Sequence, residues 1–305
     1  MNSVPPFGLP GRIFLRTEDV RVYALMRIGF AGVALYNLIL MVPFRHTLFS
    51  DAGMFDIDTA VEHSEMASVA LFHWFHTPGQ VTLLMGIVAL SMLLLMAGIL
   101  PRLAACIVFF WHLSYVERAP VGLTGWDMVL RAFSFLILVS PLGSAWNLRA
   151  WWRRAWPPPV QVARYGLVLM RLQVIVIYLQ TALAKMFDVN PYWRDGEFLP
   201  YYLMSHNARW PHAWAAENAD LLMLGTYVAL VIECAIPLLL CIRRTRLWGA
   251  LLGLFFHSLI AVVSRNLEPF LVVMMMSYLA FLNGRDLNRL HQWFTARRPP
   301  RRLVS

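Results

Sequence analysis

Charged residues are scarce in this sequence, and lysine is almost missing. Charged residues make up 14% of the 305 positions, whereas soluble domains carry about 25%. Lys185 is the only lysine, and all other basic residues are arginines. The three cysteines are too few and too scattered to indicate a disulfide framework or a zinc site. The sequence also lacks a P-loop, a dinucleotide fingerprint, a nucleophile elbow and an HExxH motif, so it does not indicate the enzyme classes that depend on these motifs.

Apolar runs are what the sequence has in abundance, since 59% of its residues are hydrophobic. Four runs of 19–21 residues are each long enough to cross about 30 Å of hydrocarbon as a helix. Four shorter runs of 14–17 residues are borderline and could be short, tilted or re-entrant spans. The long runs cover 24–42, 81–100, 165–184 and 221–241, and the shorter ones cover 103–116, 128–142, 247–263 and 269–282. The sequence therefore predicts an all-α, polytopic membrane bundle of about eight spans.

Short amphipathic helices are expected at the membrane surface, near Phe198–Met204 and around Trp151 and Trp152.

With eight spans, 17 of the 26 basic residues fall on the side of the two termini and 6 on the other side. The positive-inside rule then places both termini in the cytoplasm of a cell inner membrane. The net charge of +9 is assigned to contact with membrane lipids, and no nucleic-acid partner is expected.

Three segments follow from this topology. Residues 1–23 form a cytoplasmic N-terminal segment without a cleavable signal, residues 24–283 form the membrane domain, and residues 284–305 form a basic cytoplasmic tail. The cluster of arginines and prolines at 297–302 in that tail is expected to touch the membrane surface.

Charged side chains inside predicted spans are costly and are candidates for function. They are Arg27, Arg131, Arg171 and Glu233. Arg131 follows Asp127 by four residues, which puts both on one helix face and favours an ion pair at the outer mouth of that span. Arg171 and Glu233 could pair across the bundle. Two interpretations stay open: these residues join helices, or they line a polar cavity.

Lys185 stands out by its chemistry at the outer end of a long span. A desolvated lysine, unlike an arginine, can lose its proton near neutral pH and then serve as a general base. The alternative is a lysine whose ammonium reaches water at the helix end, and on chemistry alone this second interpretation is favoured. His257, in the middle of a span, is expected to form a hydrogen bond between helices. His73 and His76 lack a third ligand at a clear spacing, so no metal site is predicted.

Several short motifs occur in a defined order along the chain. They are Phe49-Ser50-Asp51-Ala52-Gly53, Gly125-Trp126-Asp127 with Arg131, Pro141-Leu142-Gly143 with Trp146, Arg171-Leu172-Gln173, Tyr178, Ala182-Leu183-Ala184-Lys185, Trp193-Arg194-Asp195-Gly196, and Glu233 with Pro237. Together they resemble the HTTM family, the bacterial relatives of the membrane part of vitamin K-dependent γ-glutamyl carboxylase. The resemblance covers about residues 20–283.

The resemblance implies a chemistry. In the carboxylase, a lysine at the position of Lys185 is understood as the base that starts oxidation of vitamin K hydroquinone. The oxygenated product removes a γ-proton from a peptide glutamate, and the carbanion captures carbon dioxide. Lys185 would then be catalytic, with lyase or oxidase chemistry. A reduced quinone (vitamin K hydroquinone or menaquinol) would be bound by Arg131, Arg171, Tyr178, Glu233 and His257. The substrate would be bound by Asp127, Trp193, Arg194 and Asp195.

The chain departs from the carboxylase in two ways. The carboxylase has a large luminal domain that grips its peptide, whereas this chain ends about 20 residues after the last predicted span. Residues 186–192 also lengthen the segment between Lys185 and Trp193. A membrane or extracytoplasmic protein or peptide partner is therefore expected to supply substrate binding.

Three functions remain as hypotheses. A quinol-linked membrane enzyme requires a buried Lys185 ammonium that faces a cavity. A non-enzymatic membrane factor for maturation or assembly of another protein requires a hydrated Lys185 and an apolar outer patch. A small-solute transporter ranks last, because inverted repeats are not visible in the sequence.

Overall fold

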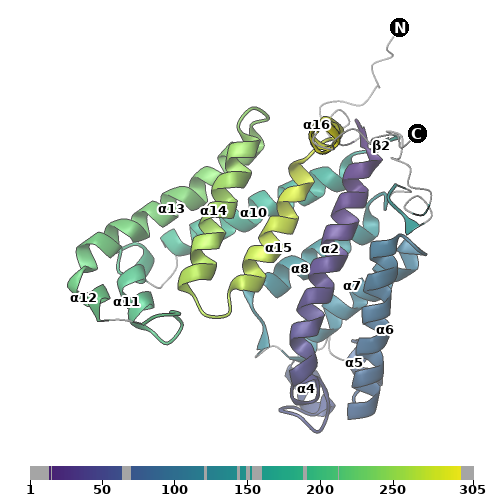
Figure 1. The fold of residues 1–305 in the computed structure, drawn as a ribbon. Coiled ribbons are helices and arrows are strands. Elements are labelled where there is room, and N and C mark those ends of the chain that lie inside the picture. The colour runs from purple at the N-terminus through teal and green to yellow at the C-terminus, as the bar shows by residue number, and fades with distance from the viewer. Residues whose placement is uncertain are drawn as a thin grey trace, which may run out of the picture.

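The computed structural model describes residues 14, 16–63, 70–119, 122–142, 145–148, 152, 160–187, 191–211 and 213–296. Helices occupy all eight apolar runs that the sequence analysis identified. They are α2 (Val20–Met41), α6 (Pro78–Ala97), α7 (Pro101–Arg118), α8 (Gly125–Val139), α10 (Tyr165–Phe187), α13 (Ala219–Cys241), α14 (Arg246–Val263) and α15 (Glu268–Tyr278). Consecutive helices run in alternating directions through the bundle (Figure 1). The predicted all-α membrane bundle is confirmed.

Eight full spans are not confirmed. Within the described residues, five helices are long and apolar enough to cross a membrane: α2 with its extension to Phe49, α6, α10, α13 and α14. A sixth span results if α15 and η5 (Leu279–Phe281) are joined to α16 (Gly284–Ala296) across a bend of 107°. α8 has 15 residues and α15 has 11, short of the ~20 that a span needs. α7 reaches 18 residues but carries Arg102, Glu117 and Arg118 at its ends.

Short elements cover the two ends of the bundle. At one end, which we name the α16 end, α16 lies near a two-stranded antiparallel ribbon of β1 (Thr17–Asp19) and β2 (Gln161–Ala163) (Figure 1). The other, the α11 end, carries η1 (Val42–Phe44), α3 (Arg45–Phe49), α4 (Ile57–His63), α5 (Leu71–Trp74), η4 (Pro191–Trp193), α11 (Phe198–Met204) and α12 (Trp214–Glu217). The predicted amphipathic piece at 198–204 is α11. Trp151 and the arginine cluster at 297–302 lie outside the described residues.

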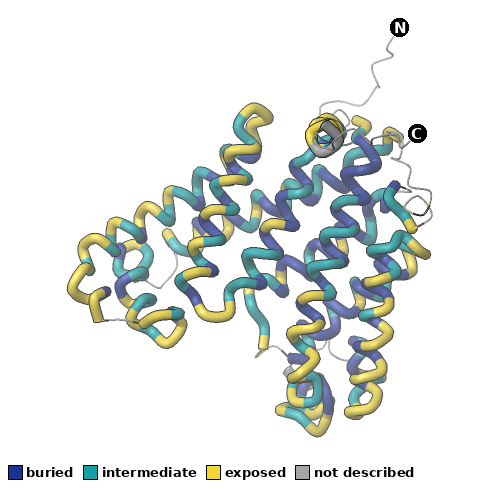
Figure 2. Tube along the Cα trace, in the orientation of Figure 1, coloured by how far each residue is buried: buried dark blue, intermediate teal, exposed yellow. Residues whose placement is uncertain are grey.

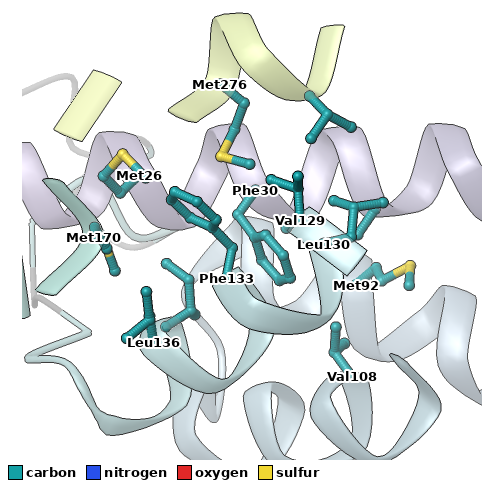
Figure 3. Close-up of a cluster of buried hydrophobic side chains, with 14 of the residues drawn as sticks. Met26, Phe30, Met92, Val108, Val129, Leu130, Phe133, Leu136, Met170 and Met276 are labelled. Atoms are coloured by element: carbon teal, nitrogen blue, oxygen red, sulfur yellow. The ribbon is translucent and has the colours of Figure 1, made fainter. Parts of the chain in front are cut away.

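The apolar core surrounds α2. Figure 2 shows buried positions concentrated along α2 and the helices beside it, while α13 carries many exposed positions. Side chains from α2, α6, α7, α8, α10 and α15 meet in one cluster (Figure 3). Its labelled members are Met26, Phe30, Met92, Val108, Val129, Leu130, Phe133, Leu136, Met170 and Met276. Helices α13 and α14 lie beside this core, where their packing leaves room for a cavity.

Asp127 does not pair with Arg131 as the sequence suggested. Asp127 closes the capping box of α8, accepting hydrogen bonds from the Thr124 amide at 2.9 Å and hydroxyl at 2.7 Å. Its second oxygen accepts from Tyr115 Oη at 2.8 Å and Asn37 Nδ2 at 3.2 Å. Arg131 instead pairs with Glu117 on α7 at 3.1 Å. The acceptors of Asp127 are already used by the start of its own helix and by α2 and α7, so Asp127 and Arg131 join helices separately.

Candidate functional site

A cavity of about 440 Å³ lies between α10, α11, α13, α14 and α15. Its wall is mainly aromatic and aliphatic, with Trp193, Phe198, Tyr202, Phe256 and Phe270 among the lining residues. Val228 and Leu259 also line it and are 48% and 51% exposed, so the cavity opens toward the apolar surface of the bundle. A volume in the range of about 300–1,000 Å³ and a mostly apolar wall are typical of small-molecule sites.

An ion pair sits in this apolar wall. Lys185 Nζ donates a hydrogen bond to Glu233 Oε1 at 2.6 Å, joining the end of α10 to α13. The side chain of Lys185 is 22% exposed and that of Glu233 is 8% exposed. The ring of Trp193 lies 4.1 Å from Nζ, as in a cation–π contact. Glu233 Oε2 is buried and has no hydrogen-bond partner in the described part of the chain.

A glycine turn places the Trp193 ring over the ammonium. Gly196 adopts φ +82°, a left-handed conformation that favours glycine. A Cβ at Gly196 would lie 3.0 Å from the ring of Tyr227, whose hydroxyl donates to the Arg194 carbonyl at 3.2 Å. Trp193 stacks on Phe198 with ring centroids 3.8 Å apart. The turn is therefore held on α13, and it closes the α11 end of the cavity.

A second polar cluster lines the cavity deeper in the bundle. Tyr178 on α10 and His257 on α14 are buried, and Tyr178 Oη lies 2.8 Å from His257 Nε2. Tyr178 Oη also forms a short hydrogen bond with Tyr278 Oη on α15. The expected hydrogen bond of His257 between helices is present. His257 Nδ1 is buried without a partner among the residues that the structure describes.

Gly253 on α14 makes room for the Tyr278 hydroxyl, and this gives a direct test of the cluster. A Cβ at Gly253 would clash with Tyr278 Oη. We expect Gly253→Ala to displace Tyr278, break its bond to Tyr178 and lower the thermal unfolding temperature by several degrees, because overpacking costs about 1–3 kcal/mol. The control is Gly86→Ala on α6, where a Cβ meets nothing within 4 Å. Equal unfolding temperatures for both variants would contradict the close packing at Gly253.

Comparison with known proteins gives the family. A family model described as the HTTM domain matches residues 16–284. The chain belongs to the HTTM family. The resemblance found in the motifs is thereby confirmed. Comparisons with curated proteins and with solved structures each gave no significant match.

The HTTM bundle brings five of the predicted site residues to one cavity. They are Tyr178, Lys185, Trp193, Glu233 and His257. Arg194 and Asp195 lie beside it at the surface, 3.5 Å apart, with side chains 63% and 52% exposed. Asp127 and Arg131 lie outside the cavity wall.

Arg171 also lies away from the cavity, and its expected pair with Glu233 is not formed. Arg171 donates to the carbonyls of Ala280 at 2.7 Å and Leu282 at 3.2 Å, and its guanidinium lies 4.0 Å from Glu18. Arg171 precedes Lys185 by 14 residues on α10, which separates them by about 21 Å along the axis. Arg171 therefore belongs to the α16 end of the HTTM domain.

Sequence analysis missed Tyr278 and the aromatic residues of α11. Tyr278 is one of several aromatic residues in apolar runs, and nothing in its spacing separates it from a core residue. Phe198 and Tyr202 lie four residues apart on α11 and stack with ring centroids 5.4 Å apart. That spacing puts both on one helix face, and it is the one signal that could have placed them against the cavity.

Proposed function

We propose that this HTTM-family chain is a quinol-linked membrane enzyme in which Lys185, partnered by Glu233, acts as the general base. The observation that carries the proposal is the 2.6 Å ion pair of Lys185 and Glu233 in the wall of an otherwise apolar cavity. The alternative, a non-enzymatic membrane factor, requires a freely hydrated Lys185 and gives no reason for an ion pair in the cavity wall. An ammonium held between a carboxylate and the Trp193 ring supports the enzyme instead.

The cavity fits a reduced quinone in size and chemistry. Its volume of about 440 Å³ and its aromatic wall suit a flat ring that enters from the lipid phase. Glu233 Oε2 and His257 Nδ1 are buried polar atoms that lack partners within the described residues, and buried polar groups require hydrogen bonds. A reduced quinone would supply two hydroxyl groups whose deprotonation precedes its oxidation. Either tautomer of His257 leaves Nδ1 able to donate or accept one bond.

Glu233 gives Lys185 access to the form that a base requires. An ammonium has no lone pair, so Lys185 can accept a proton only as the neutral amine. Transfer of one proton from Nζ to Glu233 Oε1, 2.6 Å away, produces that amine without moving a heavy atom. The amine can then take a proton from a hydroxyl group in the cavity. Tyr178, held by His257 and Tyr278, fixes the shape of the cavity beside the pair.

The orientation of the site is part of the proposal. Arginine-rich segments gather at the α16 end, and the acidic segments lie toward the α11 end. The positive-inside rule then puts the α16 end in the cytoplasm of the inner membrane and Lys185 near the outer face. Arg194 and Asp195 are exposed beside the cavity, where a membrane or extracytoplasmic protein or peptide could bring its substrate. This partner would perform the substrate binding for which the carboxylase uses its luminal domain.

Quinone retention tests the proposal. The full chain is purified in lipid nanodiscs, extracted with organic solvent and analysed for isoprenoid quinones by mass spectrometry. We expect quinone with the wild type and loss of at least about 90% of it with Ala229→Phe, which fills the cavity from α13. Val231→Phe on the same helix is the control, because Val231 is 67% exposed and lies outside the cavity wall. A wild-type protein that neither retains quinone nor oxidises added menaquinol in air would overturn the proposal.

A further inference from the structure

A second cavity, of about 610 Å³, lies at the α16 end. It is enclosed by the β1–β2 ribbon, the end of α13, the start of α14 and the start of α16. Seven of its 17 lining residues are arginines, and two are acidic. So many guanidinium groups around one space repel one another. The resulting positive potential favours binding of an anion in the cavity.

The acidic residues of this cavity are already engaged. Asp19 binds Arg21 through a bidentate contact, with Nε at 2.9 and 3.0 Å from its two oxygens. Glu18 lies 4.0 Å from Arg171, which is further held by main-chain carbonyls. Arg246 pairs at 2.8 Å with Asp286, which lies just behind the wall. In the described part of the chain, these pairs do not involve Arg16, Arg243 or Arg285.

Three arginines remain available. The side chains of Arg16, Arg243 and Arg285 form no hydrogen bond or ion pair in the part of the chain that the structure describes, and all three residues are exposed. Arg16 directly precedes β1, Arg243 lies in the turn between α13 and α14, and Arg285 lies in α16, so they approach the cavity from three different segments. Because they come from separate segments, these arginines do not form one solvated helix face.

Helix ends add to the positive potential. Among the described elements, α2, α10, α14 and α16 begin beside this cavity, while α13 and η5, which continues α15, end there. The start of a helix carries a partial positive charge of about half an elementary charge. Alone these ends would not define a site. Together with the three arginines, they favour a ligand with more than one negative charge.

We propose that this cavity binds the phosphate group of a ligand through Arg16, Arg243 and Arg285. The planar guanidinium donates two parallel hydrogen bonds to phosphate oxygens, and it stays charged where an ammonium would lose its proton. The group can belong to an anionic phospholipid or to a soluble phosphate compound. Leu240, Cys241 and Phe281 give the cavity an apolar side, which suits the glycerol and first acyl carbons of a lipid. The site is independent of the quinol chemistry proposed for the Lys185 cavity.

Two binding measurements on the full chain test this site and separate the two sources. In nanodiscs of phosphatidylcholine alone, pyrophosphate is titrated and the rise in thermal unfolding temperature gives its affinity. In detergent, native mass spectrometry compares retention of phosphatidylglycerol with retention of phosphatidylcholine. Selective retention of phosphatidylglycerol assigns the site to a lipid headgroup, and a response to pyrophosphate assigns it to a soluble phosphate.

Matched variants distinguish a built site from a charged surface. Arg243→Gln with Arg285→Gln removes two cavity arginines. The control, Arg244→Gln with Arg289→Gln, removes two charges from the same turn and the same helix outside the cavity wall. We expect the cavity variant to weaken binding of the responding probe at least about tenfold more than the control, because it removes two donors of charge-assisted hydrogen bonds to the phosphate. Equal weakening in both variants, or no binding of either probe to the wild type, would overturn the proposal.

Discussion

Lys185→Met should lower the rate of menaquinol oxidation at least about 100-fold, because a positioned general base contributes about 10²–10⁴-fold to a rate. The same change should destabilise the protein. It leaves Glu233, whose side chain is 8% exposed, as a nearly buried carboxylate without its cation. Breaking a fully buried pair costs about 3–5 kcal/mol. Because the side chain of Lys185 is 22% exposed, we expect a cost of about 2 kcal/mol here, measured as a lower thermal unfolding temperature.

The double variant Lys185→Met with Glu233→Gln separates the two effects. It removes both charges, so it should recover most of the lost stability while menaquinol oxidation stays low. Arg194→Gln is the control, because Arg194 and Asp195 form an exposed pair, and such pairs contribute only about 0–1 kcal/mol. Oxidation at the wild-type rate in Lys185→Met would end the assignment of Lys185 as a base. An active double variant would end that assignment too, because it also lacks the Lys185 amine.

The positions of the helices could be predicted from the sequence, but the number of spans could not. Each apolar run becomes a helix because a run of that length must bury its main-chain polar groups internally. Whether a helix crosses the membrane depends on more than its composition. α8 has 15 residues and packs against α2 and α7, so many of its apolar side chains are covered by protein, while Met128 and Phe135 are exposed. The sequence of α8 does not say whether protein or lipid surrounds each of these side chains.

The site around Lys185 could likewise be predicted only in part from the sequence. Lys185 and Glu233 were each recognisable, since ionisable residues in apolar runs are rare and costly. Their pairing was not recognisable, because it depends on how far α10 and α13 are shifted along each other. For the same reason the sequence allowed a pair of Glu233 with Arg171, which the structure places at the α16 end, away from Glu233. Tyr278 was missed because its place depends on the space left by Gly253 on another helix.

Arg27 was singled out by its charge, yet the structure gives it a different surrounding from that of Lys185. Arg27 is fully buried in α2. Its guanidinium donates to the carbonyls of Leu142 at 3.0 Å, Ala145 at 3.3 Å and Trp146 at 2.9 Å. The same guanidinium lies 3.0 Å from the Cβ position of Gly98, which turns the chain between α6 and α7 with φ +69°. Arg27 therefore ties the end of α8 and the α6–α7 turn to α2.

Arg27→Leu should be among the most destabilising single changes in the protein. It leaves three main-chain carbonyls without their donor, at about 1–3 kcal/mol for each buried group, so we expect a total of about 4 kcal/mol. That corresponds to a fall of roughly 10 °C in the apparent unfolding temperature. Arg27→Lys, which keeps the charge but has no planar fork, should recover only part of the loss. Arg289→Leu on the exposed face of α16 is the control and should change the temperature little.

Quinone retention per folded molecule then separates the role of Arg27 from that of Lys185. Arg27 lies outside the wall of the Lys185 cavity, so Arg27→Leu protein that remains folded at low temperature should retain quinone like the wild type. An Arg27→Leu variant that unfolds at the wild-type temperature would contradict the role of its three carbonyl contacts. A folded variant that has lost its quinone would mean that α2 sets the shape of a cavity built from α10, α11, α13, α14 and α15. The comparison thus tests whether this bundle keeps its stabilising arginine and its proposed catalytic lysine in separate parts of the fold.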